Sequence, residues 1–299
     1  MSTSLETSRV AVLVATRDRP LALRRCLESL AAQATPPAEV VVLDNAGAVP
    51  PDVAAFPAVR LVRSEAPLGV AAARQRLLDE TTADVALLLD DDAWLVDPGV
   101  LAGITSAFDA DANLAALALP MLDFRANPPV WLTPFRSASA HPAGPTCAAA
   151  YFIGGAHVLR RCAVQAVGGY DGSFVYGEEE MDLAYRLIAH GYRLAYAPDL
   201  HVEHNPEPGP PAPFNPRRLA QRVRNRIVLA WRYLPAHYLP SYLGVWLGWH
   251  LREATRNGAL NAFARGLRTG LHDARASART PLRGDALAYA KAHGGRLWF

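Results

Sequence analysis

Short apolar runs alternate with amphipathic patterns along the chain as far as Pro120. Continuous apolar runs are typical of strands covered on both faces, and leucines that recur on one face are typical of helices. The predicted strands are Val10–Ala15, Val40–Leu43, Val59–Val62, Val85–Leu89 and Leu114–Leu119. One predicted helix begins at Pro20, and two others span Val70–Leu78 and Pro98–Phe108. This alternation predicts an α/β fold: a Rossmann-like, mostly parallel central sheet with helices on both faces.

The pattern changes after Pro120. The segment Asp123–Ala150 is rich in Pro, Ser and Ala and has little periodicity, which predicts a long loop. Beyond it we expect a helix near Val158–Val167, a helix over Glu178–His190, and strands near Leu194–Ala197 and Leu200–Val202.

A second break, the Pro-rich segment Pro206–Pro216, predicts a linker that is neither helix nor central strand. Helices are predicted over Arg217–Arg232 and Tyr242–Arg268, followed by a less regular tail. We therefore expect a catalytic α/β domain over residues 1–205 and a linker with a helical extension over residues 206–299.

Composition narrows the class of protein. The chain has 299 residues, 51% of them hydrophobic, and a formal net charge of +2, which excludes a disordered chain and gives no reason to expect nucleic acid as a partner. Three irregularly spaced cysteines form no disulfide framework, which favours a reducing cytoplasm. Because no apolar stretch reaches membrane-spanning length and Val10–Ala15 is too short for a signal peptide, we expect a soluble or peripheral protein.

The strongest local signal is Asp90-Asp91-Asp92, directly after the predicted strand Val85–Leu89. Ligands of open α/β sheets bind at the carboxyl ends of the strands, and clustered carboxylates commonly hold a divalent cation or a hydroxyl-rich ligand. A solvated acidic turn, in which Asp92 caps a helix, is the alternative interpretation.

Two later features carry further candidate chemistry. Four acids crowd the first turn of the helix that starts near Glu178; the helix dipole accounts for one or two of them, and a crowded carboxylate also suits a general base. His201 and His204 follow the last predicted strand. A lone histidine is more often structural, so His204 becomes a metal ligand only if the fold brings it to the aspartates, and the mixed shell would suit Mn²⁺ or Mg²⁺.

Taken in order, seven motifs resemble glycosyltransferase family 2, which has the GT-A fold, and in particular its inverting rhamnosyl- and galactofuranosyltransferase branch. The resemblance covers roughly residues 8 to 205. The motifs are ATRDRP at 15–20, LDNAG at 43–47, GVAAARQ at 69–75, LLLDDD at 87–92, FIGGAHVLRR at 152–161, GGYDGSFVYGEEEMDLAYRL at 168–187 and VEH at 202–204.

The resemblance implies a donor site made of three groups of residues. The contacts to the nucleoside base are implied for Ala15, Thr16, Arg17, Arg19 and Asp44. Those to the ribose and diphosphate are implied for Gly69 and Arg74, with Asp90 and Asp91 also near the nucleotide. The backbone beside the donor sugar is implied for Gly154 and Gly155.

The resemblance also implies the reacting groups. Asp92 of the DXD motif, with His204, would hold Mn²⁺ or Mg²⁺, and Glu180, the second member of the acidic pair Glu179-Glu180, would be the general base. Such an enzyme is inverting and metal-dependent: the metal offsets charge on the leaving nucleoside diphosphate, and the base activates an acceptor hydroxyl for direct displacement. The donor stays open among UDP-, dTDP- and GDP-sugars. The acceptor, a glycan, glycolipid or small molecule, is expected to contact the 123–150 loop around Trp131.

The helices beyond residue 216 allow three interpretations. Packing against the catalytic domain is the simplest. Arginines beside Trp231, Trp246 and Trp249 would also suit peripheral contact with the inner face of a membrane, and a homodimer contact is the third possibility.

Two other functions compete with sugar transfer. A sugar nucleotidyltransferase has a similar sheet and acidic metal site, but the chain has no Gly-rich, Lys-bearing triphosphate loop near its start. A non-catalytic sugar-nucleotide-binding protein is the other, since fold alone does not give activity. The sugar-transfer interpretation requires that Glu180, Asp92 and His204 line a single cleft.

Overall fold

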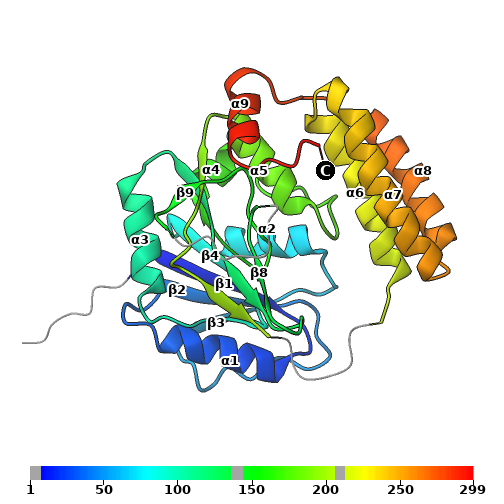
Figure 1. Cartoon of the computed structure of the whole chain (residues 1–299). Coiled ribbons are helices and arrows are strands. Elements are labelled where there is room, and N and C mark those ends of the chain that lie inside the picture. The colour runs from blue at the N-terminus through cyan, green and yellow to red at the C-terminus, as the bar shows by residue number, and fades with distance from the viewer. Residues whose placement is uncertain (1–7, 136–143, 206–212, 299) are drawn as a thin grey trace, which may run out of the picture.

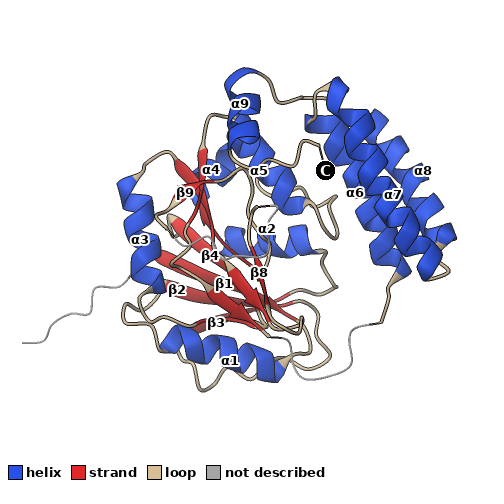
Figure 2. Ribbon diagram, viewed as in Figure 1, coloured by secondary structure: helices blue, strands red, loops and turns tan. Residues whose placement is uncertain are grey.

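The computed structural model describes residues 8–135, 144–205 and 213–298, and its centre is an eight-stranded sheet of order β3-β2-β1-β4-β10-β6-β11-β9 (Figure 2). The strands are β1 (Val10–Thr16), β2 (Glu39–Asp44), β3 (Val59–Arg63), β4 (Val85–Asp90), β6 (Leu114–Ala118), β9 (Cys147–Ala148), β10 (Ala156–Arg160) and β11 (Arg193–Tyr196). Strands β1 to β4, β6 and β11 run in one direction, and β9 and β10 run against them. The prediction of a mostly parallel sheet is confirmed.

Helices cover both faces of this sheet. Val10, Val12 and Val14 of β1 pack in one buried cluster with α1 (Pro20–Ala31) and α3 (Val100–Ala110). Ala11 and Leu13, which alternate with them, pack in a second cluster with α2 (Val70–Glu80), α4 (Arg161–Ala166) and α5 (Glu179–Ala189). Successive side chains of a strand point to opposite faces, so a run of apolar residues is needed to fill both clusters.

The helix predicted near Val158–Val167 is wrong in its first half. Residues 156–160 form strand β10, and only α4 is helical. Val158 lies opposite Leu87 of β4 and Leu117 of β6, so β10 pairs with the free edges of two strands whose other edges pair with β1 and β11. This non-local pairing overrides a helical pattern that is only local.

The loop predicted over Asp123–Ala150 is also partly wrong. It contains β8 (Val130–Leu132), which pairs antiparallel with β7 (Met121–Asp123) where the loop begins, and later β9; residues 136–143 lie outside the described part. Strands β7 and β8 join β5 (Ala93–Leu95) and β12 (Val202–His204) in a second sheet of order β5-β12-β7-β8. This small sheet connects the segment after the acidic triplet to the histidine motif.

The extension consists of α6 (Pro216–Tyr233), α7 (Leu239–Arg256), α8 (Leu260–Ala276) and α9 (Gly284–Ala292), with a short 3₁₀ turn at Ala236–Tyr238. Figure 1 shows α6, α7 and α8 side by side along one flank of the molecule, with α9 apart from them. The single helix predicted over Tyr242–Arg268 is wrong, because the chain turns at Asn257-Gly258, where Gly258 has φ 62°. Of the predicted linker, residues 206–212 lie outside the described part, and Pro216 opens α6, a position that suits proline.

The buried core continues from the sheet into the extension. Val228, Leu229 and Tyr233 of α6 belong to the same buried cluster as Leu183 and Tyr185 of α5. The arginine-rich helix therefore packs on the catalytic domain, the simplest of the three interpretations offered for it. Among the described residues, no helix combines the length and the apolar character needed to cross a bilayer.

Candidate functional site

The polar residues predicted at the strand ends do lie along one edge of the sheet. Thr16, the last residue of β1, pairs with Asp44, the last of β2, and Ala15 pairs with Asp90, the last of β4. Parallel strands that end in register present their carboxyl termini together, which is where ligands of such sheets bind.

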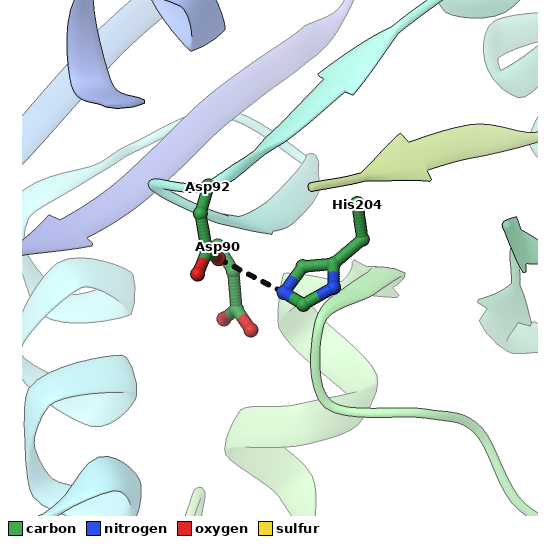
Figure 3. A group of neighbouring side chains, drawn as sticks. All are labelled: Asp90, Asp92 and His204. Atoms are coloured by element: carbon green, nitrogen blue, oxygen red, sulfur yellow. Dashed lines mark ion pairs between the residues drawn. The ribbon is translucent and has the colours of Figure 1, made fainter. Parts of the chain in front are cut away.

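His204 reaches this edge through the second sheet. Strand β12 runs antiparallel to β5, which places His204 opposite Ala93, the residue after the acidic triplet. The Nε2 atom of His204 lies 3.1 Å from Oδ1 of Asp92. Ligand atoms of Asp90, Asp92 and His204 all lie within 4.8 Å of one another, and Figure 3 shows the three side chains converging. The donor set, two carboxylates and an imidazole, fits a divalent cation such as Mn²⁺ or Mg²⁺.

Asp123 orients this histidine and was missed at the sequence level. Its Oδ1 lies 3.1 Å from Nδ1 of His204, so the two ring nitrogens face two different carboxylates. Metal-binding histidines commonly hold such a carboxylate on the nitrogen that does not bind the metal. The only available signal was position: Asp123 ends an apolar segment, MLD, whose pairing with β12 cannot be deduced from the sequence.

The charges around His204 favour the ionised carboxylates. Burial works against the charge of Asp123, but the bidentate Arg125 lowers the pKa of Asp123 to about 2. Burial also opposes the charge of Asp92, yet the hydrogen bond from His204 lowers the pKa of Asp92 below its ordinary value. The same contact raises the pKa of His204 against the effect of burial.

The protein itself occupies both carboxylate oxygens of Asp91. Oδ2 accepts a hydrogen bond of 2.7 Å from the hydroxyl of Thr16, and Oδ1 one of 2.9 Å from Arg19, which also reaches Asp92. Burial raises the pKa of Asp91 to about 6 although Arg19 opposes the shift. Thr16 and Arg19, predicted to contact the nucleoside base, thus brace the acidic triplet.

The acidic pair of α5 meets the same edge through Arg74 of α2. This guanidinium, 9% exposed, donates to Glu179 at 3.0 Å and to Glu180 at 2.8 Å, and lies 3.9 Å from Asp90. It also donates to the carbonyl oxygen of Gly154. One buried cation therefore links the predicted base to the predicted metal site.

The two glutamates are not equivalent. The Glu179 side chain is 3% exposed, and its Oε2 has no hydrogen-bond partner among the described residues. Burial and the charge of Glu180 raise the pKa of Glu179 well above its ordinary value. The Glu180 side chain is 18% exposed and keeps one oxygen on Arg74. Only Glu180 of the pair is open to a ligand.

Gly154 leaves the space that Glu180 uses. A Cβ atom built on Gly154 would lie 2.0 Å from Oε1 of Glu180 and 2.6 Å from a nitrogen of Arg74. At Gly155 a Cβ would lie 2.8 Å from the side chain of Met121 and 3.3 Å from Asp90. Both glycines, predicted beside the donor sugar, therefore lie between the base and the acidic edge.

The backbone packs closely at Gly69 and at Asp44, two other residues predicted to contact the donor. A Cβ on Gly69, which precedes α2, would lie 2.9 Å from Cα of Val175. Asp44 is buried, accepts a hydrogen bond from the amide of Gly47 and pairs with Arg63. Their predicted donor contacts are compatible with these positions.

Two predicted site residues stand apart. Arg17 is exposed and pairs only loosely, at 3.7 Å, with Asp18. Trp131 of β8 lies in register with Leu122 of β7, one residue from Asp123, so it is on the opposite face of the small sheet from His204. Its ring contacts His201 instead. The acceptor role predicted for Trp131 has no support from this geometry.

The sheet order, the acidic edge and the histidine from the second sheet define the class of protein: a GT-A fold. A family model described as "Glycosyltransferase like family 2" matches residues 8–231. The chain belongs to glycosyltransferase family 2.

A curated relative agrees with this assignment. The pre-mycofactocin glycosyltransferase of Mycobacterium tuberculosis is 30% identical over 208 residues, which are 66% of this chain and 42% of the relative. The chain thus matches less than half the length of that protein.

The fold is shared with three solved transferases. GalNAc-T7 with UDP, GalNAc and Mn²⁺ has a TM-score of 0.60 at 16% identity, covering 81% of this chain and 50% of its own. S. aureus TarS 1–349 with UDP-GlcNAc has a TM-score of 0.61 at 15% identity, covering 97% and 89%. The mannosyltransferase PcManGT from Pyrobaculum calidifontis with GDP-Man and Mn²⁺ has a TM-score of 0.53 at 20% identity, covering 96% and 76%.

Proposed function

We propose that this chain is an inverting, divalent-metal-dependent glycosyltransferase, which moves a sugar from a nucleoside-diphosphate donor to an acceptor hydroxyl by direct displacement. One observation carries the proposal. Arg74 contacts Glu180 at 2.8 Å and lies 3.9 Å from Asp90, so a candidate base and a candidate metal site face the same small region. A transferase of this kind needs one base and one charge-neutralising site, and no covalent nucleophile.

Asp90, Asp92 and His204 would hold Mn²⁺ or Mg²⁺, with Asp123 fixing the histidine ring. The bound metal would offset negative charge on the departing diphosphate as a Lewis acid. The assignment of Asp90 differs from the expectation that this residue serves the nucleotide alone. The solved complexes support a metal, since two of the three contain Mn²⁺.

Glu180 would accept the proton of the acceptor hydroxyl. Its side chain is more exposed than that of Glu179, and Arg74 stabilises its negative charge while holding the carboxylate toward Gly154. As Glu180 takes this proton, the acceptor oxygen bonds to the anomeric carbon opposite the departing nucleoside diphosphate, which inverts that carbon. Glu179, buried under the same guanidinium, would keep Arg74 in place.

The donor is proposed to be a UDP-, dTDP- or GDP-sugar held by Asp44, Thr16, Gly69 and the backbone of Gly154 and Gly155. The solved complexes contain UDP, UDP-GlcNAc or GDP-Man, so uridine and guanosine nucleotides belong in a screen, together with the dTDP-sugars expected from the sequence. The acceptor would be a hydroxyl group of a glycan, a glycolipid or a small molecule.

A donor panel tests the proposal. The protein is incubated with UDP-, dTDP- and GDP-sugars, with Mn²⁺ or with a chelator, and both heat stability and released products are measured. We expect one nucleotide class to raise the unfolding temperature in the presence of Mn²⁺ and to release nucleoside diphosphate slowly to water. Release of pyrophosphate from a nucleoside triphosphate and sugar phosphate would instead identify a nucleotidyltransferase. Binding without any release, even with candidate acceptors, would identify a non-catalytic binder.

Location is proposed as cytoplasmic, with peripheral contact at a membrane through the extension. Residues 213–299 carry 15 Lys and Arg against 3 Asp and Glu, whereas residues 1–212 carry 15 against 25. Val245 and Trp249 of α7 and Leu271 of α8 are exposed, near exposed arginines such as Arg252 and Arg275. Basic surfaces with exposed aromatic and aliphatic residues favour anionic lipid. Flotation with phosphatidylglycerol vesicles at low and high salt tests this; no flotation at low salt, or a dimer burying α7, would remove the membrane proposal.

A further inference from the structure

The extension reaches back into the turn that precedes the acidic pair. Asn225 and Arg226 lie on α6, are almost fully buried, and point at residues 176–178. Nδ2 of Asn225 donates to the carbonyl oxygens of Tyr176 at 3.0 Å and Gly177 at 2.7 Å. A nitrogen of Arg226 lies 2.6 Å from the carboxylate of Glu178.

This turn has an unfavourable backbone. Gly177 has φ 81° and Glu178 has φ 72°, so two consecutive residues are left-handed and the second has a side chain. Such a conformation persists only when neighbouring groups hold it. Helix α5 begins at the next residue, Glu179, so the path of the turn decides where Glu180 points.

Arg226 is held on more than one side. Its other terminal nitrogen donates to the hydroxyl of Tyr242 at 2.8 Å, and its guanidinium lies 3.7 Å from the ring centre of Trp246. Both aromatic residues belong to α7. The planar fork of arginine can meet a carboxylate and a hydroxyl while stacking on a ring, which lysine cannot do. Arg226 thus ties the turn to two helices of the extension.

The same loop also fixes α2. The carbonyl oxygen of Val175 accepts a hydrogen bond of 3.0 Å from the amide of Val70, the first residue of α2, and Gly69 is tightly packed against Val175. Helix α2 carries Arg74, the partner of Glu180. Both groups of the base site therefore depend on one loop, and α6 holds that loop.

Helix α6 makes a further contact one turn into α5. The hydroxyl of Tyr233 donates to Oδ1 of Asp182 at 2.7 Å, and Arg232 joins Asp182 to Asp171. Figure 1 shows α6 on the side of the extension that faces α5. The contacts at 176–178 and at Asp182 fix the start of α5 at two points.

We propose that Arg226, with Asn225, is a positioning residue for the base, so the helical extension is part of the catalytic machinery rather than an attached module. This inference rests on the proposed function of Glu180. Without Arg226 the strained turn relaxes, the start of α5 shifts, and Glu180 leaves the position set by Arg74 and Gly154. A misplacement of about 1 Å can lower turnover about 100-fold.

The test compares Arg226→Gln and Arg226→Lys with the control Glu253→Gln. Glu253 pairs with Arg222, so the control also removes an ion pair between α6 and α7 while the contacts of Asn225 and Arg226 with the 176–178 turn stay in place. Three quantities are measured: kcat and KM for the donor found in the panel, the unfolding temperature, and amide hydrogen exchange of residues 176–182. We expect kcat to fall about 100-fold in Arg226→Gln with the donor KM unchanged, and partial recovery in Arg226→Lys, which keeps the charge opposite Glu178.

Hydrogen exchange separates positioning from general stability. We expect faster exchange in Arg226→Gln confined to residues 176–182, with the unfolding temperature close to that of Glu253→Gln. Equal kcat in Arg226→Gln and Glu253→Gln, or loosening of all of α6 to α8 together with lost activity, would overturn the inference. If the unmodified chain turns over no donor, the proposed function fails, and unchanged exchange at 176–182 would overturn the positioning role independently.

Discussion

The two halves of the candidate site are built in different ways. The metal half, Asp90, Asp92 and His204, stands on strand ends whose register is fixed by backbone pairing in two sheets. The base half, Glu180 with Arg74, stands on a helix start and a left-handed turn held mainly by side chains. Sheet register is specified by many bonds at once, whereas a strained turn depends on a few.

The difference predicts where remote substitutions matter. Changes far from the metal half should alter it little unless they break β5, β7 or β12. Changes in α6, by contrast, should reach the base half directly, because Asn225 and Arg226 contact the turn before α5. The predictions below test each half in order of expected effect.

The largest effect is expected from the base half. Glu180→Gln keeps the shape of the side chain but cannot accept a proton, so turnover should fall by about 10²–10⁴-fold while donor binding is retained. Turnover is followed as release of nucleoside diphosphate, and donor binding as a shift in unfolding temperature. Glu179→Gln is the matched control. If Glu179→Gln lost turnover while Glu180→Gln kept it, the base would be Glu179 instead of Glu180.

Next comes the metal half itself. Asp92→Ala removes one of three candidate ligands and leaves His204 without the carboxylate at its Nε2. We expect Mn²⁺ no longer to strengthen donor binding. In a titration, we also expect the variant no longer to reduce the electron paramagnetic resonance signal of free Mn²⁺. Equal Mn²⁺ affinity in the variant and the unmodified chain would contradict the metal site.

Asp123→Ala should have a smaller effect on the same titration. It removes the carboxylate that orients the His204 ring, and loss of such an outer partner typically weakens metal affinity about 10–100-fold. Arg125→Gln, which removes only the partner of Asp123, should weaken it less. A larger loss in Arg125→Gln than in Asp123→Ala would show that Asp123 does not act through the histidine.

The smallest effect concerns stability at the contact between α6 and the catalytic domain. Burial opposes the charge of Asp171, but Arg232 lowers the pKa of Asp171 below its ordinary value. A lowered carboxyl pKa stabilises the fold above the unfolded value of about 4, and the gain is lost as pH falls through the folded value. Asp171→Asn should therefore unfold at a lower temperature than the unmodified chain at pH 7, and the difference should shrink as the pH falls below about 4. A difference that grows on acidification would contradict this sign.

Local pattern was sufficient for β1, β2 and β4, because each is a continuous apolar run next to a clear helix. It was insufficient for β10, whose residues adopt an extended form only because β4 and β6 lie on either side. The pair β7–β8 was hidden for a similar reason: three-residue strands are too short to show a period. The break at Gly258 inside the predicted long helix follows the pair Asn257-Gly258, and an Asn-Gly pair is a turn signal in the sequence.

The candidate site could be anticipated only as far as motif order reached. Asp92, His204, Glu180 and Arg74 were named from the sequence and meet in space. Asp123 and Arg226 were not, because each acts through a partner distant in the chain: Asp123 through a sheet pairing, and Arg226 through a turn 48 residues earlier. The contact that spans this separation joins Glu178 to Arg226.

The missing side chain at Gly154 links the identity of two positions. Its vacant volume is filled by the longer arm of Glu180, so alanine at 154 would push the Glu180 carboxylate out of the position it takes on Arg74. A shorter aspartate at 180 would free that volume. The absence of a side chain at position 154 therefore governs how the carboxylate at position 180 can lie.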